Sequence, residues 1–184
     1  MSDKNYKSYE YLIRKTVEGV SLEPENPTEY DDIMKVYRCR DCRFLDFVVE
    51  GGKEDCVDLG KESYGNEFRR MKLMPNGRYV FTIKGGSHMN YFKEIEIVGH
   101  GNDVDIEIGN WSTSNFDHSK GNVFNGIWSR DDSLVTYCYR WGCKPTFINS
   151  DVKHLWWRSI GLTFYWWFKY VWHVILKRRD NMGK

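Results

Sequence analysis

The feature that most constrains this chain is a repeat built on phenylalanine. Four phenylalanines begin segments that can be aligned, and the first three are 24 residues apart: Phe44, Phe68, Phe92 and Phe124. Each is followed three positions later by a second apolar residue: Phe47, Met71, Ile95 and Ile127. Farther along, each segment carries an alternating apolar pair: Val57/Leu59, Phe81/Ile83, Ile106/Ile108 and Tyr137/Tyr139. A glycine closes each unit soon afterwards.

Alternation of apolar and polar residues is typical of strands with one buried face. Two short strands that recur at a fixed period form one coil of a solenoid, because each coil buries its apolar stripe only against its neighbours. The sequence therefore predicts an all-β fold, a small right-handed parallel β-helix of about four coils over residues 44–142. An antiparallel meander or sandwich is the alternative that the pattern leaves open.

The repeat resembles that of right-handed parallel β-helix proteins of the pectate-lyase-like class. The phrases EDCVDLG, FTIKGGS and DIEIGNWS, at residues 54–60, 81–87 and 105–112, also resemble short β-helix proteins encoded by tailed phages. This resemblance implies a viral accessory or structural protein, and it offers no catalytic residues to carry over.

The regions on either side of the repeat suggest three parts. We expect residues 1–38 to hold a capping helix, at about 6–18, and a connector, because the end of a solenoid needs a cover. Residues 39–150 would form the solenoid domain. Within it the spacing between the third and fourth units is longer, and residues 110–121 are predicted to be a projecting loop. Residues 151–184 would form an amphipathic helix.

Residues 155–176 read LWWRSIGLTFYWWFKYVWHVIL and are followed by the basic run Lys177–Arg179. On a helical wheel most aromatic residues fall on one side and most cations on the other, which favours a helix lying in the membrane interface with its cations toward anionic lipid. A transmembrane tail and a helix packed on protein remain alternatives. The expected membrane-binding residues are Trp156, Trp157, Arg158, Phe164, Trp167, Phe168, Lys169, Trp172, Lys177, Arg178 and Arg179.

Composition excludes some classes. The 27 Lys and Arg residues nearly balance the 26 Asp and Glu residues, so a nucleic-acid partner is not expected. The N-terminal residues lack the apolar stretch of a secretory signal, which predicts the cytoplasmic side of a membrane. Four of the five cysteines, Cys39, Cys42, Cys138 and Cys143, could bind zinc, but the second spacing is too loose for a zinc ribbon. We expect reduced thiols and neither metal nor cofactor.

Carboxylates are the main candidates for ligand contact. If the apolar pairs face inward, Asp58, Asp105 and Glu107 face outward, and the repeat aligns Asp58, Thr82 and Glu107 in one column near Lys84. Stacked outward carboxylates, together with Trp111 in the projecting loop, could hold a glycan chain. Solvated charges on an exposed sheet are the plainer explanation. Motifs for phosphate, dinucleotide or metalloprotease chemistry are absent from the sequence, so enzymatic activity is not favoured.

The sequence thus predicts a non-enzymatic scaffold or binding module that is anchored at a membrane surface, with lipid headgroups and a glycan or protein as its partners. A carbohydrate-active β-helix protein is the alternative function.

Overall fold

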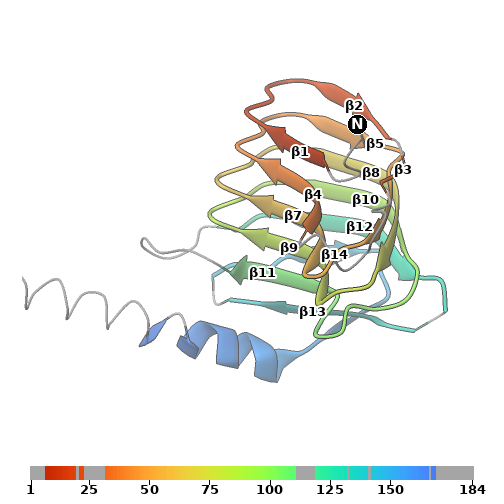
Figure 1. Ribbon diagram of the computed structural model, residues 1–184. Coiled ribbons are helices and arrows are strands. Elements are labelled where there is room, and N and C mark those ends of the chain that lie inside the picture. The colour runs from red at the N-terminus through yellow and green to blue at the C-terminus, as the bar shows by residue number, and fades with distance from the viewer. Residues whose placement is uncertain are drawn as a thin grey trace, which may run out of the picture.

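The computed structural model describes residues 7–19, 21–22, 32–110, 119–131, 133–140, 142–165 and 167–168. The chain is a parallel β-solenoid of about five turns, followed by one helix near the C-terminus (Figure 1). The predicted fold class is confirmed, although the solenoid has about one turn more than expected.

Two parallel sheets run along the solenoid. The first has the order β1 (Lys7–Glu10), β4 (Asp32–Tyr37), β7 (Asp55–Gly60), β9 (Tyr79–Lys84), β11 (Ile106–Asn110), β13 (Val135–Tyr139) and β15 (Val152–His154). The second has the order β14 (Thr146–Ile148), β12 (Val123–Ser129), β10 (Tyr91–Ile97), β8 (Glu67–Pro75), β5 (Arg43–Leu45) and β2 (Thr16–Glu18). Strand β3 (Ser21–Leu22) pairs with β6 (Val48–Gly51), which also pairs with β8.

The aligned phenylalanines form one continuous stack through the interior. Phe44 pairs in register with Phe68, Phe68 with Phe92, and Phe92 with Phe124. Their ring centroids are 5.0, 4.9 and 4.5 Å apart. Phe147 extends the stack at 5.0 Å from Phe124. Stacked apolar side chains in adjacent coils are therefore the core that the repeat predicted.

A bulge explains why the second apolar residue of each segment follows the phenylalanine by three positions and not by two. The residue two positions after each phenylalanine has a positive φ: Asp46 (60°), Arg70 (53°), Glu94 (57°) and Gly126 (71°). One extra residue in this conformation turns the next side chain back to the interior. Phe44 and Phe47 are thus both fully buried.

The turns between the sheets contain a ladder of buried asparagines that the sequence did not reveal. Asn66 donates a side-chain hydrogen bond to Asn90 at 3.0 Å, and Asn90 donates to Asn122 at 3.1 Å. The same amides also bond backbone groups of adjacent coils. Buried turns thereby keep their polar groups satisfied.

The prediction of a capping helix near the N-terminus is wrong. Residues 7–10 and 16–18 form strands β1 and β2, which pair with β4 and β5. Tyr9 and Val17 pack against the core, and the ring of Tyr9 lies 5.4 Å from that of Phe44. The solenoid therefore includes residues that we expected to cap it. Most of the expected connector and residues 111–118 of the expected loop lie outside the described residues.

The predicted C-terminal helix is present at residues 156–165 and continues at 167–168. It lies beneath the last coil, next to β13 in Figure 1. Among the described residues, no helix has the length and apolar character needed to cross a membrane.

Candidate functional sites

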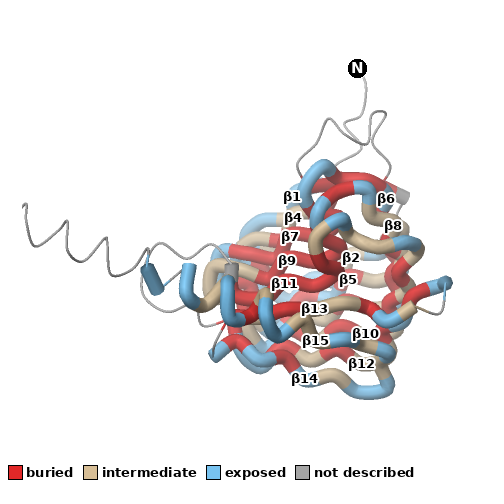
Figure 2. Tube along the Cα trace, turned by 90° about the horizontal axis from the view of Figure 1, so that it is seen from below, coloured by how far each residue is buried: buried red, intermediate tan, exposed pale blue. Residues whose placement is uncertain are grey.

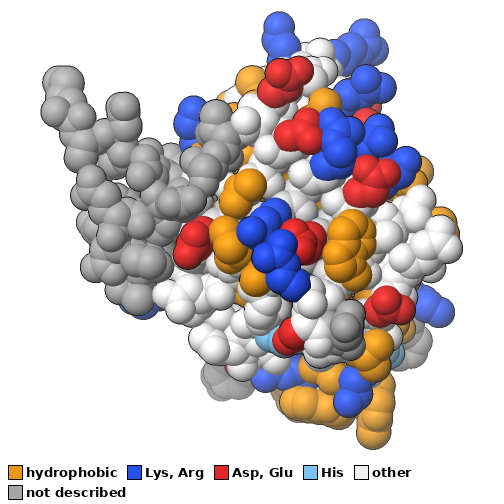
Figure 3. Space-filling view, turned by 90° about the vertical axis from the view of Figure 1, so that its right-hand side faces the viewer, with side chains coloured by type: hydrophobic (Ala, Val, Ile, Leu, Met, Phe, Trp, Pro, Cys, Tyr) orange, Lys and Arg blue, Asp and Glu red, His pale blue; other side chains and the backbone are white. Residues whose placement is uncertain are grey.

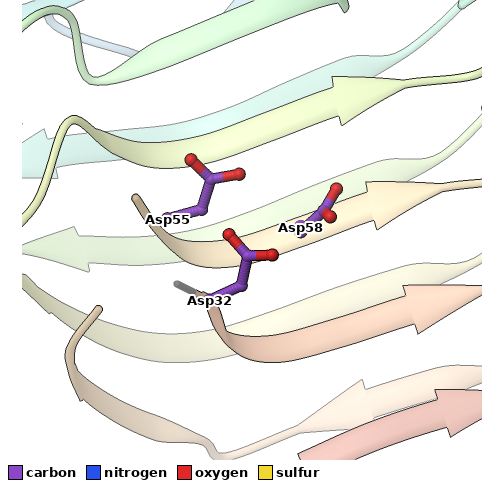
Figure 4. Close-up of side chains that lie close together, drawn as sticks. All are labelled: Asp32, Asp55 and Asp58. Atoms are coloured by element: carbon purple, nitrogen blue, oxygen red, sulfur yellow. The ribbon is translucent and has the colours of Figure 1, made fainter. Parts of the chain in front are cut away.

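Three aspartates gather on the first sheet, at the point where strands β4 and β7 begin. Asp32 and Asp55 pair in register, and Asp58 lies three residues farther along β7. One carboxylate oxygen from each lies within 4.8 Å of the others (Figure 4). All three side chains are buried. We call Asp32, Asp55 and Asp58 the acidic cluster.

Each carboxylate of the acidic cluster has one oxygen near a cation. Lys35 Nζ lies 3.2 Å from Asp32 Oδ2, and Lys84 Nζ lies 2.9 Å from Asp58 Oδ2 and 3.8 Å from Asp55 Oδ2. Tyr37 donates its hydroxyl to Asp58. The other oxygen of each aspartate has no hydrogen-bond partner among the described residues.

Burial and mutual repulsion change the acidity of the cluster. Burial, with repulsion from Asp32, raises the pKa of Asp55 to about 8. Burial also raises the pKa of Asp58, although Lys84 and Tyr37 oppose this shift. For Lys84, burial lowers the pKa, but Asp58 and Asp55 outweigh it and the pKa is raised overall. The lysine therefore stays charged, whereas Asp55 tends to hold a proton.

Gly60 makes this arrangement sterically feasible. A Cβ atom at that position would lie 3.0 Å from the Tyr37 ring and 3.6 Å from Lys84 Cγ. Without a side chain there, Tyr37 and Lys84 both pass over β7 to reach Asp58. The glycine that ends this repeat unit thus also admits the cation of the cluster.

The predicted column of Asp58, Thr82 and Glu107 is confirmed by the strand register. The expected exposure of its carboxylates is wrong, because Asp58 is 0% and Glu107 5% exposed. Tyr37 and Lys84 contact Asp58, and Glu107 lies against Cys138. These carboxylates therefore do not line an exposed groove of the kind expected for glycan contact, and Trp111 lies outside the described residues.

Asp105 is also fully buried. The register places it one position before Ile106, level with Cys56 and Val80, where the chain turns inward. Its carboxylate accepts hydrogen bonds from the backbone of Gly101 and from Thr136, and it also contacts His100. Asp105 therefore ties adjacent coils together.

The contact between His100 and Ser133 resembles part of an acyl-transfer triad, because Asp105 lies at the other nitrogen of the ring. However, the Ser133 hydroxyl donates to Asp131 at 2.6 Å. Ser133 therefore donates its proton to the Asp131 carboxylate and not to the His100 ring. We interpret this group as part of the turn.

The cysteines are free and buried, as expected for reduced thiols. Burial raises the pKa of Cys39 to about 11 and raises that of Cys56 and Cys138 further. Thiols of this kind are poor nucleophiles and poor metal ligands. The Cys39-x-x-Cys42 motif is thus part of the interior of the second coil.

The C-terminal helix has one face toward the solenoid. Ser159 is buried, and its hydroxyl accepts a hydrogen bond from the Tyr139 backbone at 3.0 Å. Arg158, which we expected to face lipid, lies 3.3 Å from Asp103. Leu155 packs beside Tyr79 and Cys138. The first turns of the helix are therefore anchored on the last coils.

Much of the helix is exposed (Figure 2), and the face opposite these contacts carries aromatic residues. Its large apolar residues are between 47% and 64% exposed: Trp156, Trp157, Ile160, Phe164, Tyr165, Trp167 and Phe168. In Figure 3, hydrophobic side chains gather at the lower end of the molecule, where Figure 1 places the helix. The predicted residues Lys169, Trp172, Lys177, Arg178 and Arg179 lie outside the described residues.

An apolar hollow of about 630 Å³ opens between this helix and the last coils. Its lining residues are Tyr139, His154, Trp156, Ser159, Ile160, Thr163, Phe164 and Trp167. The helix therefore offers an apolar surface and a cavity together at one end of the solenoid.

Comparison of the chain with models of protein families, with curated proteins and with solved structures found no match. The resemblance to pectate-lyase-like and phage proteins accordingly gains no support beyond the solenoid itself. On its own structure, this chain is a parallel β-solenoid protein.

Proposed function

We propose that this protein is a non-enzymatic scaffold or binding module that its C-terminal helix holds on an anionic membrane surface. The observation that carries the proposal is the exposure of the helix face that contains Trp156, Phe164 and Trp167. Exposed apolar patches of this kind mark surfaces that contact another phase or another molecule.

The composition of this face favours lipid over a protein partner. Trp and Tyr concentrate at the level of lipid headgroups, where an apolar ring and a polar N–H or O–H are both accommodated. In the sequence, the described part of the helix is followed by Lys169 and the run Lys177–Arg179. Each such cation near an anionic surface contributes about 1 kcal/mol of attraction.

The contacts between the helix and the solenoid determine how the solenoid would be oriented on a membrane. Arg158 pairs with Asp103, and Ser159 bonds the backbone of β13. Because those side chains are held by the solenoid, the aromatic face stays exposed at the end of the solenoid, where part of it borders the apolar hollow. A helix that lies in the interface by this face would carry the solenoid above the headgroups.

Flotation with lipid vesicles tests the proposal. The full chain is expected to float with vesicles that contain phosphatidylserine and to float less with neutral phosphatidylcholine. The variant Trp156→Ser/Phe164→Ser/Trp167→Ser is expected to stay at the bottom of the gradient. Trp128→Ser is the matched control, because Trp128 is an exposed tryptophan of the solenoid itself.

Two outcomes would reject the proposal: failure of the full chain to float with either vesicle, or equal flotation of the triple variant. Light scattering of the same samples identifies another occupant of the helix face. If the native chain is a dimer in solution and the triple variant a monomer, the face is an interface between two copies.

The alternative, a carbohydrate-active solenoid, has less support. It requires carboxylates on an accessible surface, whereas Asp58, Asp105 and Glu107 are buried and bonded within the solenoid.

A further inference from the structure

The acidic cluster holds more negative charge than its neighbours balance. Three carboxylates face two lysines, Lys35 and Lys84. The aspartate side chains are 7%, 3% and 1% exposed for Asp32, Asp55 and Asp58 respectively. A charge that is buried to this degree needs a counter-ion or a proton, because water cannot solvate it.

The unused oxygens of the cluster are the second observation. Asp32, Asp55 and Asp58 each pair through Oδ2, and each leaves a buried Oδ1 without a partner among the described residues. The buried side chain of Thr82, the neighbour of Asp58 in the register, adds a further oxygen beside Asp55, whose pKa its hydrogen bond lowers. Native proteins leave few buried polar atoms unsatisfied, and an ion or water commonly accounts for the exceptions.

We propose that the acidic cluster binds one hard divalent cation that ties β4 to β7. All the donor atoms are oxygens, which suit Ca²⁺ and Mg²⁺ and not the softer metals. Cys56, the thiol next to Asp55 in the sequence, bonds Gly51 and belongs to the interior cluster. It is therefore not a ligand.

Burial of the cluster favours Ca²⁺ over Mg²⁺, because Mg²⁺ gives up its water reluctantly and usually keeps several water ligands. One oxygen from each carboxylate lies within 4.8 Å of the others, so a single ion can contact all three aspartates. Asp58 can bind the ion through Oδ1 while its Oδ2 stays paired with Lys84.

The proposed site has a structural consequence. Asp32 belongs to the second coil and Asp55 and Asp58 to the third. An ion shared between them would hold these coils together at a place where their carboxylates otherwise repel. The proposal is independent of membrane binding, and its test contains no lipid.

Calorimetric titration of the full chain, first stripped with EDTA, measures the site directly. Addition of CaCl₂ is expected to show one binding site per chain and to raise the thermal midpoint, and MgCl₂ to bind at least tenfold more weakly. Asp55→Asn and Asp32→Asn are expected to lose binding. Asp46→Asn should retain it, because Asp46 is exposed and bonded to Arg70.

Absence of binding heat and of any thermal shift with both ions would overturn the proposal, and so would unchanged binding in Asp55→Asn. Should both cluster variants fail to fold, anomalous diffraction from native crystals soaked in Tb³⁺ decides. A peak between Asp32, Asp55 and Asp58 supports the site, and no peak there refutes it.

Discussion

The solenoid and the C-terminal helix use apolar residues in opposite ways. In the solenoid, Phe44, Phe68 and Phe92 are 0% exposed because each coil covers the next. In the helix, Trp156 and Phe168 are both 64% exposed. The solenoid thus covers its phenylalanines with its own coils, whereas the helix leaves its aromatic side chains exposed, as interaction surfaces do.

The same contrast appears in how the two regions treat charge. On the outer face of the second sheet, cations and carboxylates of adjacent coils pair with each other, as in Arg130 with Glu96 at 2.7 Å. Figure 3 shows acidic and basic side chains interleaved on that side of the solenoid. The helix region depends instead on cations that follow it in the sequence, Lys177–Arg179. Charge serves cohesion in one region and, on our proposal, attraction to lipid in the other.

The largest expected effect is on the solenoid core. Phe92→Ala removes the ring between Phe68 and Phe124 and leaves a cavity, which should lower the free energy of unfolding by about 3–5 kcal/mol. Urea denaturation followed by circular dichroism measures it. The folded variant should still bind vesicles. A loss below about 1 kcal/mol would mean that the stack does not hold the coils together.

The second effect concerns the lysine of the acidic cluster. Lys84→Met leaves Asp58 and Asp55 buried without their cation and should cost about 3 kcal/mol, the lower end for a broken buried pair, since Asp55 can take up a proton. Chemical denaturation in EDTA at neutral pH measures the cost. Lys93→Met is the control, because Lys93 pairs with Glu94 at the surface. An equal loss in both variants would contradict the burial argument.

The third effect is a dependence of stability on pH. The folded pKa of Asp55, about 8, lies above its value in the unfolded chain, so the folded state binds more protons between about pH 4 and 8. In EDTA, stability should therefore fall as the pH rises through this window. Asp32, Asp58 and Lys84 face the same group, and their charges act on its pKa.

Asp55→Asn is the matched variant for this pH effect, because it keeps the shape and removes the ionisation. Its denaturation midpoint should vary less between pH 5 and pH 8 than that of the native chain. Equal slopes in the two proteins would show that Asp55 does not hold a raised pKa.

The smallest expected effect on stability is in the helix. Trp167→Ser changes a half-exposed side chain and leaves the anchoring contacts of Arg158 and Ser159 in place. The thermal midpoint should not change measurably in a calorimetric scan, whereas vesicle binding should weaken. A large drop in the midpoint would show that the aromatic face packs on protein.

The sequence predicted the solenoid because Phe44, Phe68 and Phe92 recur at a fixed period, and a periodic core is a local signal. It did not reveal the first coil, where Val17 stands at the position of Phe44 and Tyr9 at the position of Val36. The sequence pattern there reads equally well as a helix. The helix near the C-terminus was predictable because its aromatic residues cluster.

The acidic cluster was only partly predictable. Asp58 could be identified from simple alternation with Val57 and Leu59. Asp55 could not be identified in this way, because the strand has an irregularity: two successive residues, Cys56 and Val57, both face the interior. Simple alternation would have placed Asp55 on the inner face together with Val57. The same irregularity moves Asp105 inward. Asp32 lies in a region that we expected to be a connector, so its pairing with Asp55 could only come from three-dimensional register.

The most direct test of the account is quenching of tryptophan fluorescence by lipids with brominated acyl chains. With anionic vesicles, the full chain should be quenched strongly, the variant Trp156→Ser/Phe164→Ser/Trp167→Ser much less, and Trp128→Ser as strongly as the native chain. Absence of quenching in the full chain would contradict the claim that the aromatic face of the helix enters the membrane interface.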